Sequence, residues 1–250
     1  MSREGNRGWF GVLFALMVPF SALAAGDNRD DIRLYTLYFN DGAVTSKPLF
    51  EGGIGFADFD GGRRREISLR GMTPISSRFE LGGELFLRDE RYDKGSVKEQ
   101  SGLSDIRVVG RFHRKLYRVL DHLTIGGELT LPTGKEELGE QRLNLAGFVA
   151  ARKRIDYQLI GVATAGLYLI DQDDNHKISL HSGAGLIYTV DERLALSGEF
   201  TFHTEEQFAV LVGGADILIP DKGRIRPSFS LGVADGAPDV AIYFGYSQSL

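Results

Sequence analysis

The sequence contains no cysteine and, beyond its N-terminus, no long apolar run. Without cysteine the chain forms no disulfide bonds, which fits an exported protein that does not rely on oxidative folding. A membrane-spanning helix needs roughly 18 to 20 apolar residues, and the longest apolar run, residues 159–170, is shorter and carries two glycines and a threonine. A spanning helix is therefore excluded. A spanning β-barrel is not, because its strands alternate rather than being apolar throughout.

An excess of positive charge is also absent. The chain has 29 Lys and Arg against 34 Asp and Glu, a net charge of −5, which argues against nucleic acid as a partner. Its length of 250 residues, with 32 glycines and 42% hydrophobic residues, suits one large all-β domain.

The N-terminus has the pattern of a secretory signal peptide. Arg3 and Arg7 precede an apolar run that ends in SALAA, with Ala22 and Ala24 at the small-residue positions of a cleavage site. We therefore predict a signal peptide over residues 1–25. A membrane anchor is the weaker alternative, because the run is short and contains a proline.

Residues 26–48 follow the predicted signal peptide and do not alternate cleanly. They include IRLYTLYF, which is rich in β-formers. We expect a periplasmic or lumen-associated segment, either as an extra strand or packed against a barrel formed by residues 49–250.

Alternation is clearest between Leu103 and Gly134. Ile106, Val108 and Phe112 share one parity, whereas charged side chains occupy the other. A period of two is the signature of a β-strand whose faces meet different surroundings. One face of this stretch is expected to contact an apolar medium and the other a polar one.

The same pattern recurs through the rest of the chain. We expect strands near residues 50–59, 64–74, 78–88, 103–114, 121–132, 142–152, 156–170, 177–189, 193–203, 207–218, 223–233 and 239–250. Most approach the 9 to 11 residues or so that cross a bilayer at a tilt. About twelve such strands would enclose more apolar surface than a small soluble barrel accepts. The sequence therefore predicts an all-β, transmembrane antiparallel β-barrel rather than a soluble one.

An even strand count places both ends of the barrel chain on the same side of the membrane. With the C-terminus periplasmic, the connections expected to face outward are residues 89–102, 133–141, 171–176, 204–206 and 234–238.

Two segments resemble a known family. GLSDIRVVGRF (residues 102–112) and LTIGGELTLPTGK (residues 123–135) are similar to motifs of an outer-membrane β-barrel family associated with the meta-pathway of phenol degradation. Residue Ser104 replaces the usual glycine before Asp105. The resemblance implies a barrel and transport of aromatic or other hydrophobic solutes. The last segment, VAIYFGYSQSL, is similar to the closing strand of such barrels but ends in Leu250 rather than Phe.

Strand parity also predicts which side chains line the lumen. The candidates for a solute pathway are Glu80, Glu84, Arg88, Asp105, Arg107, Arg111, Glu128, His181, Glu199, His203 and Arg226. Acids and bases are mixed, so pairing between neighbouring strands offsets the cost of desolvation. We expect a polar, charge-paired and partly occluded lumen, gated by residues 89–102 or by the N-terminal segment.

The predicted function is a channel or transporter for small solutes in the bacterial outer membrane. Its expected partners are outer-membrane lipid, a small-molecule solute and the outer-membrane assembly machinery. A structural envelope barrel without conductance is one alternative. The other is an acyl-ester hydrolase, for which the adjacent His181 and Ser182 are the nearest candidates, although neighbouring strand residues point to opposite faces.

Other chemistry has little support. Asp171, Asp173 and Asn175 have the opening spacing of a calcium loop, but its glycine and closing glutamate are missing. The five histidines are scattered rather than at metal-ligand spacing. We therefore predict no catalytic residues, no cofactor and no metal site.

Overall fold

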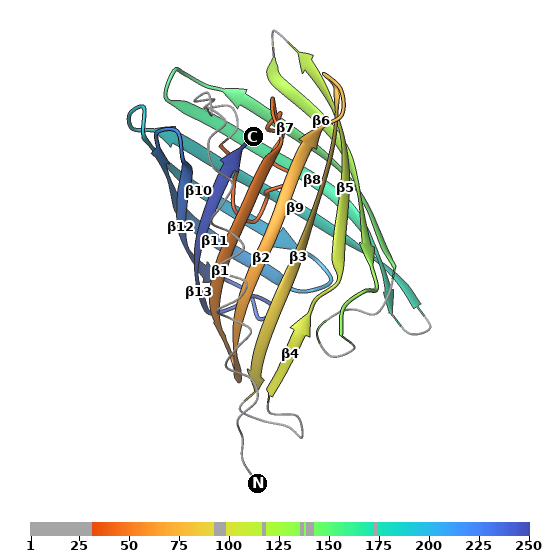
Figure 1. The fold of residues 1–250 in the computed structure, drawn as a ribbon. Coiled ribbons are helices and arrows are strands. Elements are labelled where there is room, and N and C mark those ends of the chain that lie inside the picture. Colours follow the sequence, from red (N-terminus) through yellow and green to blue (C-terminus); the bar gives the residue numbers. More distant parts are fainter. Residues whose placement is uncertain (1–31, 93–98, 117–118, 136–137, 139–142, 173–174) are drawn as a thin grey trace.

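Antiparallel strands close into a barrel in the computed structural model (Figure 1), which describes residues 32–92, 99–116, 119–135, 138, 143–172 and 175–250. The strands are β1 (Leu49–Phe59), β2 (Gly62–Pro74), β3 (Phe79–Tyr92), β4 (Glu99–Leu103), β5 (Ile106–Leu116), β6 (Leu120–Leu131), β7 (Asn144–Arg154), β8 (Leu159–Gln172), β9 (Asn175–Thr189), β10 (Leu194–His203), β11 (Phe208–Ile219), β12 (Gly223–Gly232) and β13 (Val240–Ser249). Among the described residues, no helix is long and apolar enough to cross a membrane. The predicted signal peptide, residues 1–25, lies outside the described residues.

Pairing of the first strand with the last closes the barrel. β1 runs antiparallel to β13 from Leu49 opposite Ser249 to Asp58 opposite Val240, and the other pairings join strands that are neighbours in sequence, except that β5 pairs with β3 rather than with β4. β4 and β5 both pair with β3 and together occupy one position in the wall. The predicted barrel of twelve strands is confirmed.

The region around β4 differs from the sequence expectation. The sequence predicts a loop over residues 89–102 and one strand over residues 103–114, whereas β3 continues to Tyr92 and β4 pairs with it before the chain reaches β5. The register changes between Leu87 opposite Leu103 and Glu84 opposite Arg107. Between these two pairs the chain opposite β3 has one residue more than β3 itself, and this extra residue forms a bulge. Alternation in the sequence alone does not reveal it.

The barrel has two distinct ends. We call the end that holds Leu49 and Ser249 the terminal end and the opposite one the loop end. The connections predicted to face outward all join strands at the loop end. That the loop end faces the cell exterior stays a prediction.

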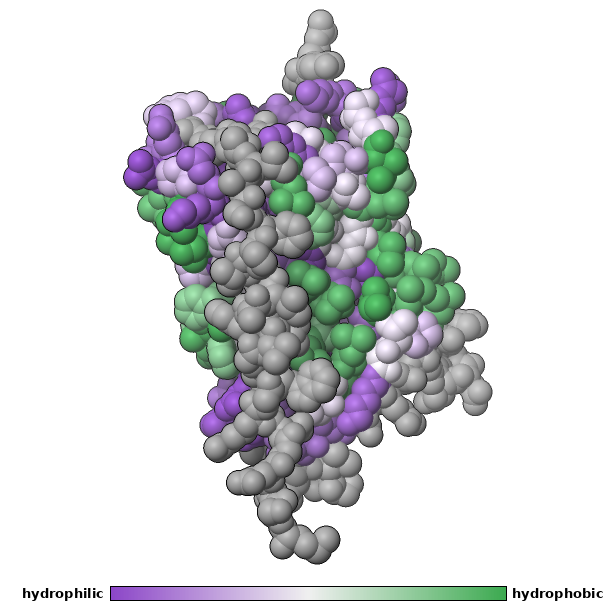
Figure 2. Space-filling view, in the orientation of Figure 1, coloured by the Kyte–Doolittle hydropathy of each residue, from purple (hydrophilic) through white to green (hydrophobic). Residues whose placement is uncertain are grey.

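The barrel presents apolar side chains on its outer surface and polar side chains inside, which is the reverse of a soluble barrel. Leu167 and Ile178, on the outer surface, are 57% and 60% exposed, whereas Ser179 beside them is fully buried. Figure 2 shows apolar side chains in a band across the middle of the described surface and polar side chains towards both ends. Contact between so large an apolar belt and water is unfavourable, so this surface is suited to contact with lipid.

Residues 32–48, which we call the plug segment, form turns inside the barrel. Ile32, Leu34 and Leu37 cluster with side chains of β8, β9 and β10, while Tyr38 and Phe39 cluster with those of β1, β2, β5 and β7. The plug segment therefore spans the lumen and provides its apolar core.

Inward-facing glycines make room for the plug segment. A Cβ atom on Gly214 would lie 2.2 Å from the Tyr35 ring, and one on Gly185 would lie 2.6 Å from Leu34. Side chains at these two positions would overlap the plug segment, so its close approach to the wall depends on glycine.

Candidate functional site

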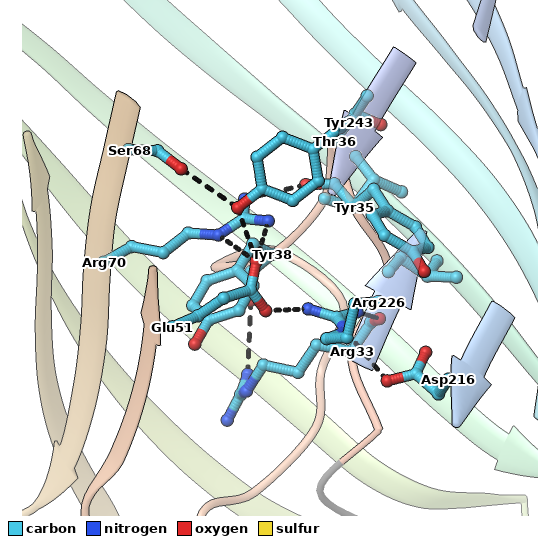
Figure 3. A network of polar contacts seen from close by, with 12 residues as sticks. Arg33, Tyr35, Thr36, Tyr38, Glu51, Ser68, Arg70, Asp216, Arg226 and Tyr243 are labelled. Carbon is cyan, nitrogen blue, oxygen red and sulfur yellow. Dashed lines mark hydrogen bonds and ion pairs between the residues drawn. The ribbon is translucent and has the colours of Figure 1, made fainter. Parts of the chain in front are cut away.

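A network of buried, charged side chains connects several strands of the barrel wall beside the plug segment (Figure 3). The Glu51 carboxylate accepts hydrogen bonds from Arg70 (Nε to Oε1, 2.9 Å) and from Arg226. Arg226 Nε also donates to Asp216 Oδ1 at 2.8 Å, and the Tyr243 hydroxyl donates to Glu51 at 3.0 Å. Opposite charges from strands β1, β2, β11 and β12 thus compensate one another away from water.

The two arginines of this network also bind the plug backbone. Arg70 Nη1 donates to the Tyr35 carbonyl at 3.0 Å, and Arg226 Nη2 donates to the Arg33 carbonyl. Because a guanidinium offers several donors in one plane, each arginine serves a wall carboxylate and a plug carbonyl at once. The network therefore positions the plug segment as well as the wall.

Glu199 on β10 binds the turn of the plug segment. Its carboxylate accepts hydrogen bonds from the Tyr35 amide at 2.7 Å, from the Thr36 amide at 3.2 Å and from the Thr36 hydroxyl at 2.8 Å. Successive backbone N–H groups in such a turn form a natural anion-binding nest. Glu199 thereby satisfies donors that would otherwise lack partners in the lumen.

A second set of contacts holds the rest of the plug segment. Arg33 pairs with Asp41 within the segment, Nη1 to Oδ1, at 3.2 Å. Arg152 of β7 donates to the Ile32 carbonyl at 3.1 Å. Further along, the Thr45 amide donates to Glu80, and Arg111 donates to the Ala43 carbonyl. The plug segment is thus hydrogen-bonded to several sides of the barrel.

The eleven candidates predicted to line a solute pathway separate into three groups. Those that hydrogen-bond to the plug segment are Glu80, Arg111, Glu199 and Arg226. Those nearer the loop end are Glu84, Arg88, Arg107, Glu128, His181 and His203. Asp105 lies at the bulge between β4 and β5.

The loop-end carboxylates Glu84 and Glu128 are buried, and the arginine that pairs with them is partly exposed. Arg107 forms ion pairs with Glu84 and, at 3.2 Å, with Glu128, and its side chain is 32% exposed. Its guanidinium lies 5.5 Å from the centre of the Phe39 ring in the plug segment. Arg107 therefore links the plug segment to a charged layer that water can reach.

Four rings stack along the wall near the loop end. Tyr168 and His181 have centroids 3.6 Å apart, His181 and His203 are also 3.6 Å apart, and His203 and Phe208 are 4.8 Å apart. The interpretation of the histidines as scattered is wrong for this pair, because strand register places His181 directly opposite His203. Asn40 of the plug segment donates to the Tyr168 hydroxyl at 3.2 Å.

The arrangement around His181 does not match a hydrolase. Its Nε2 atom lies 3.0 Å from Glu206 Oε1, and the Ser179 hydroxyl donates to Glu206 Oε2 at 2.7 Å. Ser182, the candidate nucleophile beside His181, lies opposite Phe202 in the strand register and therefore on the other face. Ser179 bonds the carboxylate rather than the imidazole, whereas an activated nucleophile needs contact with its base. The segment with the opening spacing of a calcium loop includes Asp173, which lies outside the described residues.

The two family-like motifs contact each other at the bulge. The Asp105 carboxylate accepts a hydrogen bond from the Gly134 amide at 2.8 Å, and the Thr133 hydroxyl accepts one from the Ile106 amide at 3.0 Å. A Cβ atom on Gly134 would lie 2.7 Å from the Asp105 nitrogen. Glycine is required there for close packing.

A cavity of about 530 Å³ opens near the terminal end. Its lining includes Val44 of the plug segment together with Ser77, Arg78, His113 and Lys115. The cavity is rich in positive charge and lies between the plug segment and the rim of the barrel.

Sequence reasoning missed several residues of this site. Alternation within β1 would have assigned Glu51 to the lumen. The plug residues Arg33, Tyr35 and Asp41 had no such signal, because turns lack a fixed period.

Comparisons with solved structures agree on the fold. An outer membrane channel from Pseudomonas putida F1 matches with a TM-score of 0.68 and 14% identity over 84% of this chain and 98% of that one. The KdgM porin, solved in complex with disordered oligogalacturonate, matches with a TM-score of 0.59 and 12% identity over 81% and 99%. The toluene transporter TodX of P. putida matches with a TM-score of 0.50 and 8% identity over 90% and 94%.

No family model and no curated protein sequence matches the chain. The shared feature of the matching structures is their architecture, which at these identities establishes the fold. The chain therefore has the fold of bacterial outer-membrane β-barrel channels.

Proposed function

We propose that this protein is a bacterial outer-membrane channel for small solutes, and that its plug segment closes the lumen until it is displaced. The observation that carries the proposal is that Glu199, Arg70 and Arg226 of the wall bind the plug backbone through hydrogen bonds, beside its apolar packing, without any covalent cross-link. These contacts can exchange for water one by one. Once the plug segment moves, polar side chains would line the passage.

The proposed solute class is small and aromatic. The ring stack from Tyr168 to Phe208 and the partly exposed guanidinium of Arg107 offer stacking and cation–π contacts. The motif resemblance to the family associated with the meta-pathway of phenol degradation supports the same class. TodX, which shares the fold, is a toluene transporter, and the KdgM porin was solved with oligogalacturonate.

The remaining parts of the proposal concern export and assembly. Residues 1–25 would be removed as a signal peptide, residues 26–48 would form the lumen-associated segment, and residues 49–250 would be inserted by the outer-membrane assembly machinery. The protein would act by passage of solute rather than by catalysis.

A structural barrel without conductance is a second candidate, favoured by the extent to which the plug segment fills the lumen. Planar-bilayer recordings and liposome-swelling assays separate the two. Benzoate is the probe, and gluconate is the control of equal charge without a ring. Faster swelling in benzoate supports an aromatic channel, equal swelling retains the channel but rejects the aromatic class, and an electrically silent barrel that admits neither solute supports the structural role.

A further inference from the structure

The turn between β10 and β11 brings a carboxylate to the two stacked histidines. His181 on β9 lies directly opposite His203 on β10, and Glu206 follows in the turn. One potential ligand atom from each of the three lies within 4.8 Å of the others. Imidazole nitrogen and carboxylate oxygen are ligands that zinc and related transition metals accept.

We propose that His181, His203 and Glu206 form a binding site for a divalent transition-metal ion of the zinc class. The three side chains supply two nitrogens and one oxygen, which leaves a fourth position for water or another ligand. The ion would take the place of the proton between His181 Nε2 and Glu206 Oε1, which lie 3.0 Å apart. The two rings lie nearly parallel, with an interplanar angle of 4°, so they must rotate out of the stack for their nitrogens to point to a common ion.

Surrounding contacts hold the carboxylate in position. Ser179 donates to Glu206 Oε2 at 2.7 Å and accepts a hydrogen bond from the Glu205 amide at 3.3 Å. Gly236, between β12 and β13, packs so closely that a Cβ atom there would lie 1.9 Å from the Glu206 carbonyl oxygen. Such outer contacts orient ligands and strengthen metal binding.

The protonation states also suit a metal. A metal ion binds a carboxylate in its ionised form. Two stacked imidazoles repel each other when both are protonated, whereas a metal ion binds both in their neutral form.

An ion can reach the group from the loop end. The Glu206 side chain is 39% exposed and the His181 side chain is 15% exposed. In the part of the chain that the structure describes, no second group of three His, Asp or Glu side chains meets the same geometry. The metal proposal goes beyond the proposed channel function, because binding is measured without any flux.

Calorimetric titration of the folded full-length barrel with Zn²⁺, together with Cu²⁺ electron paramagnetic resonance, tests the proposal. The variants are His203→Gln and Glu206→Gln, with Ser179→Ala as a milder change. The control is His122→Gln, since His122 lies near the start of β6 at the terminal end. Heat-dependent gel mobility verifies that every variant is folded.

We expect one Zn²⁺ per chain and Ca²⁺ binding that is far weaker. His203→Gln and Glu206→Gln should each weaken Zn²⁺ binding at least about tenfold, and Ser179→Ala should weaken it by a smaller factor. The Cu²⁺ spectrum should change from two nitrogen ligands to one in His203→Gln and stay unchanged in His122→Gln. Zn²⁺ binding that is absent from the wild type, equal in all variants, or equally weakened by His122→Gln would overturn the proposal.

Discussion

The carboxylate of Glu199 accepts a hydrogen bond from the Tyr35 amide at 2.7 Å, between residues 164 positions apart in the sequence. The same carboxylate accepts further bonds from Thr36. One wall side chain thus fixes the turn of the plug segment, and the closed state of the proposed channel depends on it.

Glu199→Ala should release this turn. Its amides would lose a charged acceptor, and bonds of this kind contribute about 1.5 to 3 kcal/mol each. We expect hydrogen exchange of the Tyr35 and Thr36 amides to accelerate. Glu205→Ala is the control, because Glu205 pairs with Lys177 at an exposed site. Exchange that is equally slow in both variants would mean that Glu199 does not hold the plug segment.

Gly214→Ala should push the plug segment away from the wall. The new methyl group would overlap the Tyr35 ring, and overpacking of this kind costs about 1 to 3 kcal/mol. Gly213→Ala is a matched control on the adjacent residue, where an added Cβ meets open space. Bilayer recordings should show more frequent opening in Gly214→Ala only. Equally frequent opening in the two variants would show that conductance does not depend on the position of Tyr35.

Glu51→Gln should destabilise the barrel. The substitution removes the negative charge that pairs with the buried guanidinium groups of Arg70 and Arg226. Breaking a buried ion pair in this way lowers the free energy of unfolding by about 3 to 5 kcal/mol. Asp58→Asn removes a partner of the exposed Arg63 and should cost under about 1 kcal/mol. Denaturant unfolding in lipid vesicles measures both. Similar losses would show that the buried network does not stabilise the fold.

Ile125→Arg tests the assignment of the outer face. Ile125 lies in the middle of β6 and is 54% exposed, so arginine there should cost about 2 to 4 kcal/mol in a bilayer. Val119→Arg, at the terminal end, should cost about 0 to 1 kcal/mol. Insertion yield into vesicles provides the measurement. If both variants insert equally well, the apolar belt does not face lipid.

The barrel could be predicted from the sequence because its physical cause is local. Each strand must present alternate residues to lipid and to the lumen, so Leu129 and Glu128 show the pattern without any knowledge of their neighbours. The bulge at Asp105 was not predictable in this way, since it depends on how Gly134 and Thr133 pack against a different strand.

The candidate site was harder to predict because its contacts join distant segments. Parity identified Glu199 and Arg226 as lumen-facing candidates, but the carbonyls and amides that they bind belong to turns without a repeating pattern. The approach of His203 to His181 follows from strand register, which no single strand encodes. Glu206 belongs to a turn that strand parity does not cover.

A disulfide lock on the plug segment tests the central claim most directly. The hydroxyl oxygens of Thr36 and Thr201 lie 2.7 Å apart, and the chain has no cysteine, so Thr36→Cys together with Thr201→Cys creates a single cross-link between the plug segment and β10. Each single-cysteine variant serves as the control. In planar bilayers we expect the oxidised double variant to stay closed and to conduct like the wild type after reduction. Equal conductance of the oxidised and reduced forms, or silence of the wild type itself, would contradict a channel gated by its plug segment.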